Sequence, residues 1–245
     1  MKTSSLFIII ATALPLVCLA AGKSTNYAPD SLAGYGATAQ ETGTTLKITL
    51  TFGADTYAQT GSTKDTNPDD FAVGSYTYLK TGANTAVITN TDVRMMSHFG
   101  VTNVTAIYVT FKNANSGSYT WTNDSASGTG KIKFTHLKNL APTTVSGSSM
   151  SARGTTFNFA NDGTFLEYKN GSEAGSGTYT FAPVSPIVGM LELVWTDAAN
   201  PPGAVAYCEL TFSSATKVAI VQSWYQFPSL DSDPQDFGQA TGKIQ

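Results

Sequence analysis

Residues 74–78 read GSYTY and residues 177–181 read GTYTF, so the same short line stands twice in one chain. Three more segments return in the same order: FGAD at 52–55 as FAND at 159–162, VTF at 109–111 as LTF at 210–212, and TGKI at 129–132 as TGKI at 241–244. The copies lie between 101 and 112 positions apart. Solenoid repeats have periods of about 20–50 residues, so this longer spacing indicates that a whole domain is duplicated.

Alternation of apolar and polar residues predicts β-strands in both copies. Leu46, Ile48, Leu50 and Phe52 alternate with threonine and lysine, which is the period of a half-buried strand. Clusters of Gly, Asn, Asp and Ser interrupt the chain about every 8–12 residues, as in an all-β meander. The predicted strands lie near 33–39, 45–52, 55–59, 74–80, 85–91, 104–112, 117–123 and 129–135, and near 147–153, 155–160, 163–169, 176–182, 189–196, 204–213, 217–226 and 240–245.

The predicted fold class is all-β, with two tandem antiparallel meander modules of about eight strands each. Short connections favour up-and-down hairpins, and eight such strands can close into a small barrel. A β-sandwich is the alternative, because strand number alone does not exclude it. Pro142 interrupts the pattern between the copies, so we expect one module at 23–138 and its duplicate at 139–245. The linker is short, and we expect the modules to be in contact.

Residues 1–22 have the pattern of a secretory signal peptide. Lys2 precedes an apolar run at 6–19, and small residues follow at 20–22. The run is shorter than the about 20 residues of a membrane-spanning helix. An uncleaved anchor and a lipid-modified Cys18 are the alternatives, but the residue before this cysteine is Val17 where a lipoprotein signal has a small residue. The sequence therefore predicts export to the periplasm, the outer surface or the medium.

Composition excludes some partners. Charged residues make up 13% of the chain and the formal net charge is −3, whereas a nucleic-acid-binding surface needs a basic stripe. Hydrophobic residues make up 41%, which is enough to form packed cores. After removal of the signal only Cys208 is left, so no disulfide within the chain is expected.

The line GSYTYLKTGANTA at 74–86 carries a resemblance. It is similar to a GTYTYTKTGANTA-like line in the β-repeat modules of uncharacterised exported proteins from environmental bacteria. The order of a Phe-rich strand, this line and a Leu/Val-Thr-Phe strand fits the same modules over nearly the whole mature chain. Such modules resemble lipocalin-like meander barrels in strand number and order. The resemblance implies a fold, and it brings no catalytic residues with it.

Candidate nucleophiles, bases and metal ligands are few. Nucleophilic catalysis needs a base beside the nucleophile, and the chain has only His98 and His136, which have no counterparts in the second copy. We interpret both as loop histidines. Zinc would need three or four His or Cys ligands at local spacing, and two separated histidines and the one cysteine of the mature chain do not supply that. Cys208 aligns with Ile107 on an inward position, so we predict a buried core residue rather than a reactive thiol.

Two runs of aspartates suggest Ca²⁺ loops, which need six to eight oxygen ligands. They contain Asp65, Asp69 and Asp70 in the first copy, and Asp231, Asp233 and Asp236 in the second. Neither matches an EF-hand loop, and Asn-Pro and Asp-Pro favour turns, so we interpret both as solvated turns. No acid–base pair is evident among the scattered carboxylates Glu167, Glu173, Glu192 and Glu209. We therefore assign no catalytic residues, metal or cofactor.

The aromatic residues leave several functions open. Strands favour aromatic side chains, so we interpret these as packing residues, although they could also stack on sugars: Tyr76, Tyr78, Tyr119, Trp121, Trp195, Trp224 and Tyr225. Large inward residues predict barrels filled by side chains. The sequence favours a non-catalytic binding or cell-surface protein, with a cell-surface glycan as one partner. A lipocalin-like carrier of a small apolar ligand is the alternative, and a hydrolase is a third hypothesis. The sequence specifies neither the ligand-binding residues nor the oligomeric state.

Overall fold

The computed structural model describes residues 25–45, 47–61, 67–197 and 201–245. Its first eight strands are β1 (Tyr35–Glu41), β2 (Lys47–Phe52), β3 (Thr56–Thr60), β4 (Ala72–Lys80), β5 (Thr85–Met95), β6 (Asn103–Asn113), β7 (Ser116–Thr122) and β8 (Ser127–His136). The next eight are β9 (Ser149–Ala152), β10 (Thr155–Phe159), β11 (Thr164–Lys169), β12 (Ser172–Pro183), β13 (Val188–Trp195), β14 (Val205–Phe212), β15 (Lys217–Tyr225) and β16 (Asp236–Ile244). A 3₁₀ turn, η1 (Pro68–Asp70), precedes β4.

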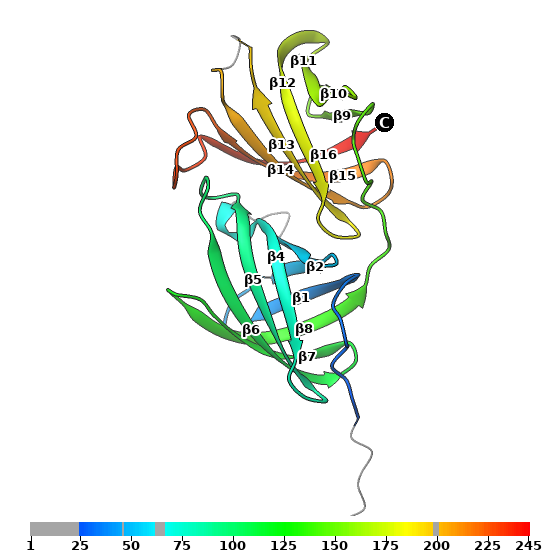
Figure 1. The fold of residues 1–245 in the computed structure, drawn as a ribbon, viewed down its shortest axis with the longest axis vertical. Helices are drawn as coiled ribbons and strands as arrows, with labels where there is room; N and C mark the ends of the chain where they lie inside the picture. The colour runs from blue at the N-terminus through cyan, green and yellow to red at the C-terminus, as the bar shows by residue number, and fades with distance from the viewer. Residues whose placement is uncertain (1–24, 46, 62–66, 198–200) are drawn as a thin grey trace, which may run out of the picture.

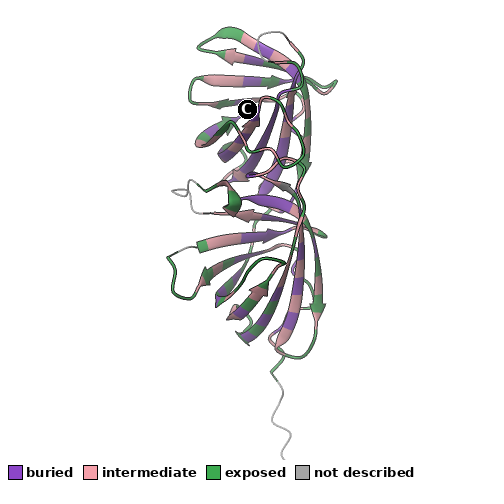
Figure 2. Cartoon of the chain, turned by 90° about the vertical axis from the view of Figure 1, so that its left-hand side faces the viewer, coloured by how far each residue is buried: buried purple, intermediate pink, exposed green. Residues whose placement is uncertain are grey.

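Each set of eight strands closes into an antiparallel barrel, and the two barrels follow one another along the chain (Figure 1). β1 pairs with β8 from Tyr35↔His136 to Glu41↔Gly130, and β9 pairs with β16 at Ser151 and Met150. These closing pairs confirm the all-β fold of two meander barrels and exclude the sandwich alternative. Buried residues alternate with exposed ones along strands such as β6 and β8, as a one-sided core requires, whereas β13 and β14 are buried on both faces (Figure 2).

The two barrels have the same framework at the repeated motifs. Gly74 and Gly177 occupy the same place in β4 and β12, and a Cβ at either would clash with a carbonyl oxygen of the facing strand. Two positions later, Tyr76 donates to the Gly53 carbonyl at 3.1 Å, as Tyr179 donates to the equivalent carbonyl at 2.8 Å. Each tyrosine ring also lies 4.9 Å from the phenylalanine that ends the second strand of its barrel. The repeated line thus fixes the same corner twice.

One end of each barrel is closed by the segment that precedes its first strand. Leu32 is fully buried in the first core and Val145 is 1% exposed in the second. Both stand two residues before a glycine with positive φ, Gly34 or Gly147, whose N–H donates to the carbonyl of the phenylalanine that ends the second strand. Tyr78 donates to the Pro29 carbonyl at 2.7 Å and fastens the first of these segments. The opposite end carries the β1–β2, β3–β4, β5–β6 and β7–β8 connections and their counterparts.

The barrels are docked against each other through an apolar interface. The outer faces of β3 and β4 and the residues beside them meet the outer faces of β13, β14 and β15 in one buried cluster, formed by Ala58, Phe71, Val73, Met96, Val184, Val188, Met190, Val205, Tyr207, Val221 and Tyr225. Hydrogen bonds cross the same boundary: Thr56 donates to the Val184 carbonyl at 2.5 Å, and Tyr225 donates to the Met96 carbonyl at 3.1 Å. The contact expected from the short linker is therefore present.

The predicted signal peptide, with Cys18, lies outside the described residues. Among the residues that are described, no helix is long and apolar enough to cross a membrane.

Candidate functional site

Each barrel contains a cavity at the end opposite its closing segment. The cavity of the second barrel has a volume of about 440 Å³ and that of the first about 380 Å³, within the range of small-molecule pockets. The expectation that side chains fill both interiors is therefore wrong for this end. Several of the large inward residues that were predicted to fill the barrels pack the middle and the closed end of each barrel. Examples are Phe52 and Phe111 in the first copy and Phe159 and Phe212 in the second. The rows nearer the open end leave space.

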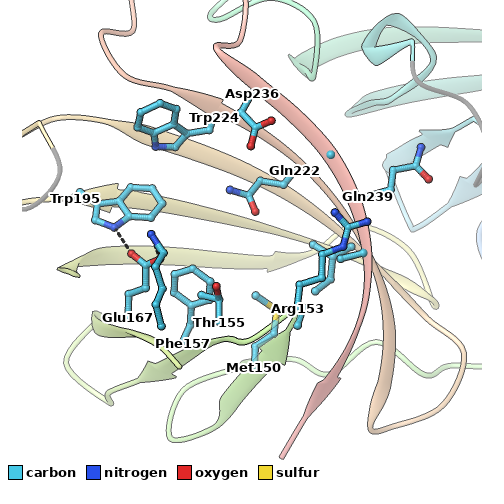
Figure 3. Close-up of a pocket in the computed structure, with 15 residues that line it drawn as sticks. Met150, Arg153, Thr155, Phe157, Glu167, Trp195, Gln222, Trp224, Asp236 and Gln239 are labelled. Carbon is cyan, nitrogen blue, oxygen red and sulfur yellow. Dashed lines mark hydrogen bonds and ion pairs between the residues drawn. The ribbon is translucent and has the colours of Figure 1, made fainter. Parts of the chain in front are cut away.

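The second-barrel cavity combines aromatic faces with hydrogen-bonding groups. Its described lining residues are Met150, Ala152, Arg153, Thr155, Phe157, Glu167, Lys169, Trp195, Ile220, Gln222, Trp224, Asp236, Gly238, Gln239 and Ala240. Figure 3 shows Trp195 and Trp224 on one side, Arg153 on the other, and Gln222 between them. Trp195 and Glu167 are buried, whereas Arg153 and Asp236 are exposed at the rim. The buried part of the lining therefore combines apolar and aromatic side chains with one carboxylate, and charged side chains stand at the rim.

Trp195 is held in place by a buried carboxylate. Its indole Nε1–H donates to Glu167 Oε2 at 3.0 Å, and Lys169 Nζ lies 3.1 Å from Glu167 Oε1. The ring packs edge-on against Phe165 at 5.5 Å between centroids. Because both the polar and the apolar edges of the indole have partners, its orientation is fixed before any ligand arrives.

The first-barrel cavity has a different lining. The described residues around it are Ala39, Glu41, Ile48, Leu50, Gln59, Asp69, Asp70, Asp92, Met95, Asn103, Thr105, Ile107, Tyr119, Trp121 and Asn123. Asp92 is 7% exposed, and burial raises its pKa to about 6, although a hydrogen bond with Asn103 acts in the opposite direction. Trp121 Nε1–H donates to Glu41 Oε1 at 3.3 Å.

The strand registers show which positions correspond in the two cavities. Gly74 pairs with Asp92 and Gly177 pairs with Trp195, so the aspartate of one copy is a tryptophan in the other. By the same registers Gln59 corresponds to Glu167. The duplication has therefore kept the cavity and exchanged the groups that line it.

Some of the residues singled out in the sequence lie outside these cavities, and others line them. Cys208 is 1% exposed in the second core, as predicted, and burial raises the pKa of its thiol to about 12. His136 ends β8 on the surface, with its ring 3.8 Å from that of Tyr35. Four of the predicted aromatic residues line the cavities: Tyr119, Trp121, Trp195 and Trp224. Tyr76 and Tyr78 donate hydrogen bonds to the Gly53 and Pro29 carbonyls. Tyr225 lies in the interface between the barrels.

The two aspartate runs meet across the interface. His98 Nδ1 lies 3.4 Å from Asp231 Oδ1 and 3.3 Å from Asp233 Oδ1, and its Nε2 lies 3.9 Å from Asp69 Oδ1. The interpretation of two separate solvated turns therefore needs correction, because inter-barrel docking brings these loops together around one histidine. Within the described part of the chain, no group of three or more His, Cys, Asp or Glu is arranged to hold a metal ion. Asp65 lies outside that part.

Glu209 is buried in the interface between the barrels. It points outward from β14, as the alternation predicts, but docking leaves it fully buried. Thr60 Oγ1 donates to Glu209 Oε1 at 2.5 Å, and Glu209 Oε2 has no hydrogen-bond partner. Loss of water raises the pKa of this carboxyl to about 8. Glu192 on the neighbouring strand β13 is only half-buried, and Glu173 on β12 is exposed.

No protein-family model, curated protein or solved structure matches the chain. The two cavities and their residues are therefore the evidence on function.

Proposed function

We propose that the chain is a non-catalytic binding protein whose second barrel takes a small saccharide. The observation that carries the proposal is the placement of tryptophan: the chain has three, and all three line the two cavities. Two of them, Trp195 and Trp224, stand in the second cavity beside polar side chains. Trp195 is also part of the second core, and Trp121 and Trp224 pack against the cores, so the support for binding is that all three line the cavities at the open ends.

The lining of the second cavity fits the two surfaces of a sugar ring. The C–H face of a sugar is flat and weakly polar, and an indole face offers apolar contact of the same shape. Sugar hydroxyls both donate and accept hydrogen bonds, as do the Gln222 and Gln239 amides, while Asp236 accepts and Arg153 donates. A few polar groups around an otherwise apolar wall is the usual composition of a ligand pocket.

Binding is better supported than hydrolysis. Glycoside hydrolysis uses two carboxyl groups, one acting as an acid and the other as a base or nucleophile. The buried carboxylate of the second cavity, Glu167, already accepts from Trp195 and pairs with Lys169. Asp236 is exposed at the rim. Glu167 therefore orients the indole, which is a positioning role.

Isothermal titration of the full chain with glucose, galactose, mannose, N-acetylglucosamine, cellobiose and maltose tests the proposal. At least one of these sugars should bind. The Trp224→Ala variant should bind that sugar at least tenfold more weakly, which corresponds to a loss of about 1.4 kcal/mol of binding free energy. Tyr108→Ala removes an exposed aromatic side chain from the outside of the first barrel and should leave the affinity unchanged. Absence of heat with every sugar, or equal loss in both variants, would contradict the proposal.

The exported location and the lipocalin-like character are part of the same proposal. A barrel closed at one end by its preceding segment and open at the other has the form that a carrier needs. Export by a signal at 1–22 stays a prediction, and the intact mass of the secreted protein tests it: the chain should lack these residues.

A further inference from the structure

We propose that the cavity of the first barrel binds an amphipathic organic cation, such as a primary amine with an apolar body. This site is distinct from the saccharide site in the second barrel and does not rest on it. The proposal follows from the charge of the residues that line the cavity, from an unpaired buried acceptor next to its buried carboxylate and from its apolar wall.

The charged residues among the described lining of this cavity are all acidic. Glu41, Asp69, Asp70 and Asp92 line it, and none of its described lining residues is Lys, Arg or His. In the second cavity, by contrast, Arg153 and Lys169 accompany the acidic residues. Asp92 is also buried within the barrel, where water screens its charge least. A cation in the cavity therefore gains more from Asp92 than from a carboxylate on the surface.

A second acceptor lies next to Asp92 on the inward face of β5. Asn90 alternates with Asp92 and with the core residue Ile88, and it pairs across the sheet with Thr105, which lines the cavity. Its side chain is 2% exposed, and its Oδ1 has no hydrogen-bond partner. A buried acceptor without a partner is costly and is rare in folded proteins. An ammonium group supplies three N–H donors, and Asp92 in the cavity lining can accept from it, while Asn90 lies one inward position deeper on β5, next to that lining.

The rest of the lining suits the body of such a ligand. Ile48, Leu50, Met95 and Ile107 form apolar wall, which favours alkyl or aryl groups over a hydrated metal ion. Trp121 and Tyr119 also line the cavity, and aromatic faces attract cations within about 6 Å. Hydrophobic burial supplies affinity, and the carboxylates select for positive charge.

Comparison with the second copy shows that the acidic group is specific to this barrel. Trp195 stands where the first barrel has Asp92. Glu41 pairs with Gly130 in β8, and by the repeat of TGKI its counterpart is Ala152. Neither the buried Asp92 nor the rim residue Glu41 therefore has an acidic counterpart at the equivalent position of the second barrel. We infer that the duplicated barrels select different ligands.

Titration of the full chain with matched pairs tests this inference: 2-phenylethylamine against 2-phenylethanol, and hexylamine against hexanol. The members of each pair differ in the charged group and share the apolar body. At pH 7.5 at least one amine should bind at 1:1 and at least tenfold more tightly than its alcohol. Asp92→Asn should remove that preference. Asp55→Asn, which changes an exposed carboxylate at the closed end of the same barrel, should retain it.

Three results would overturn the inference: no binding of either amine, equal affinity for amine and alcohol, or an unchanged preference in Asp92→Asn. Glu41→Gln at the rim is a second variant in case Asp92→Asn does not fold, and it should weaken amine binding without changing the affinity for the alcohol. Because the Trp224→Ala variant affects only the second cavity, it should bind the amine normally, which separates this inference from the saccharide proposal.

Discussion

Replacing Glu209 by glutamine should flatten the pH dependence of stability. Burial raises the pKa of this carboxyl from 4.5 to about 8. Between these values the folded protein keeps a proton that the unfolded chain has released, so the free energy of unfolding falls as pH rises. The pKa difference between the unfolded and the folded state corresponds to ~5 kcal/mol of free energy of unfolding, at about 1.4 kcal/mol per pKa unit. The stabilisation is complete below pH 4.5 and is lost above about pH 8.

The neutral amide preserves the shape of the side chain and the oxygen that accepts from Thr60. We therefore expect Glu209→Gln to equal the wild type near pH 5 and to exceed it increasingly toward pH 9. For a chain of this size, 1 kcal/mol shifts the melting temperature by about 2–4 °C, so the gap at pH 9 should be on the order of 10 °C.

Calorimetry and urea unfolding of both proteins at pH 5, 6, 7, 8 and 9 measure this gap. Glu173→Gln is the matched control, because that carboxylate is exposed on β12, and its profile should follow the wild type. Parallel profiles for the wild type and Glu209→Gln would refute the reasoning, since they would mean that Glu209 titrates alike in the folded and unfolded states.

Three further predictions concern the repeated framework. Gly177→Ala should destabilise the protein by about 2 kcal/mol or more, because its Cβ meets the carbonyl of the facing strand, whereas Gly238→Ala, with no atom within 4 Å of its Cβ, should be nearly neutral in urea unfolding. Cys208, 1% exposed, should react with Ellman's reagent only after denaturation, and labelling of the native protein within minutes would contradict its burial. Tyr76→Phe and Tyr179→Phe should each cost about 1 kcal/mol in thermal unfolding, and clearly unequal costs would argue against equivalent corners.

The fold was predictable because its signals are local and repeated. Alternation along residues such as Ile48, Leu50 and Phe52 gives the inward face of a strand, and the ordered motifs place the same strands in both copies. Cys208 was placed correctly by its alignment with Ile107. Closure into barrels follows from pairing between the first and last strands of each copy, which a count of strands does not specify.

The sites were less predictable because they depend on distance in space. The sizes of inward side chains suggested filled barrels, but size alone does not show how far opposite walls stand apart at the open end. Glu167 looked scattered in the sequence, and its role emerges only when the barrel brings it to Trp195. Glu209 and His98 acquire their surroundings from inter-barrel docking, which alternation within a strand does not record.

The most direct test of the central claim, that these barrels hold small ligands at their open ends, is native mass spectrometry of the protein purified from the cells that make it. The native mass should exceed the denatured mass of the same sample by that of a small molecule, and tandem fragmentation should identify a saccharide. The part of the excess that is due to the saccharide should be absent from Trp224→Ala prepared in the same way. Equal native and denatured masses at every collision energy, with no sugar or amine binding in titration, would contradict the claim.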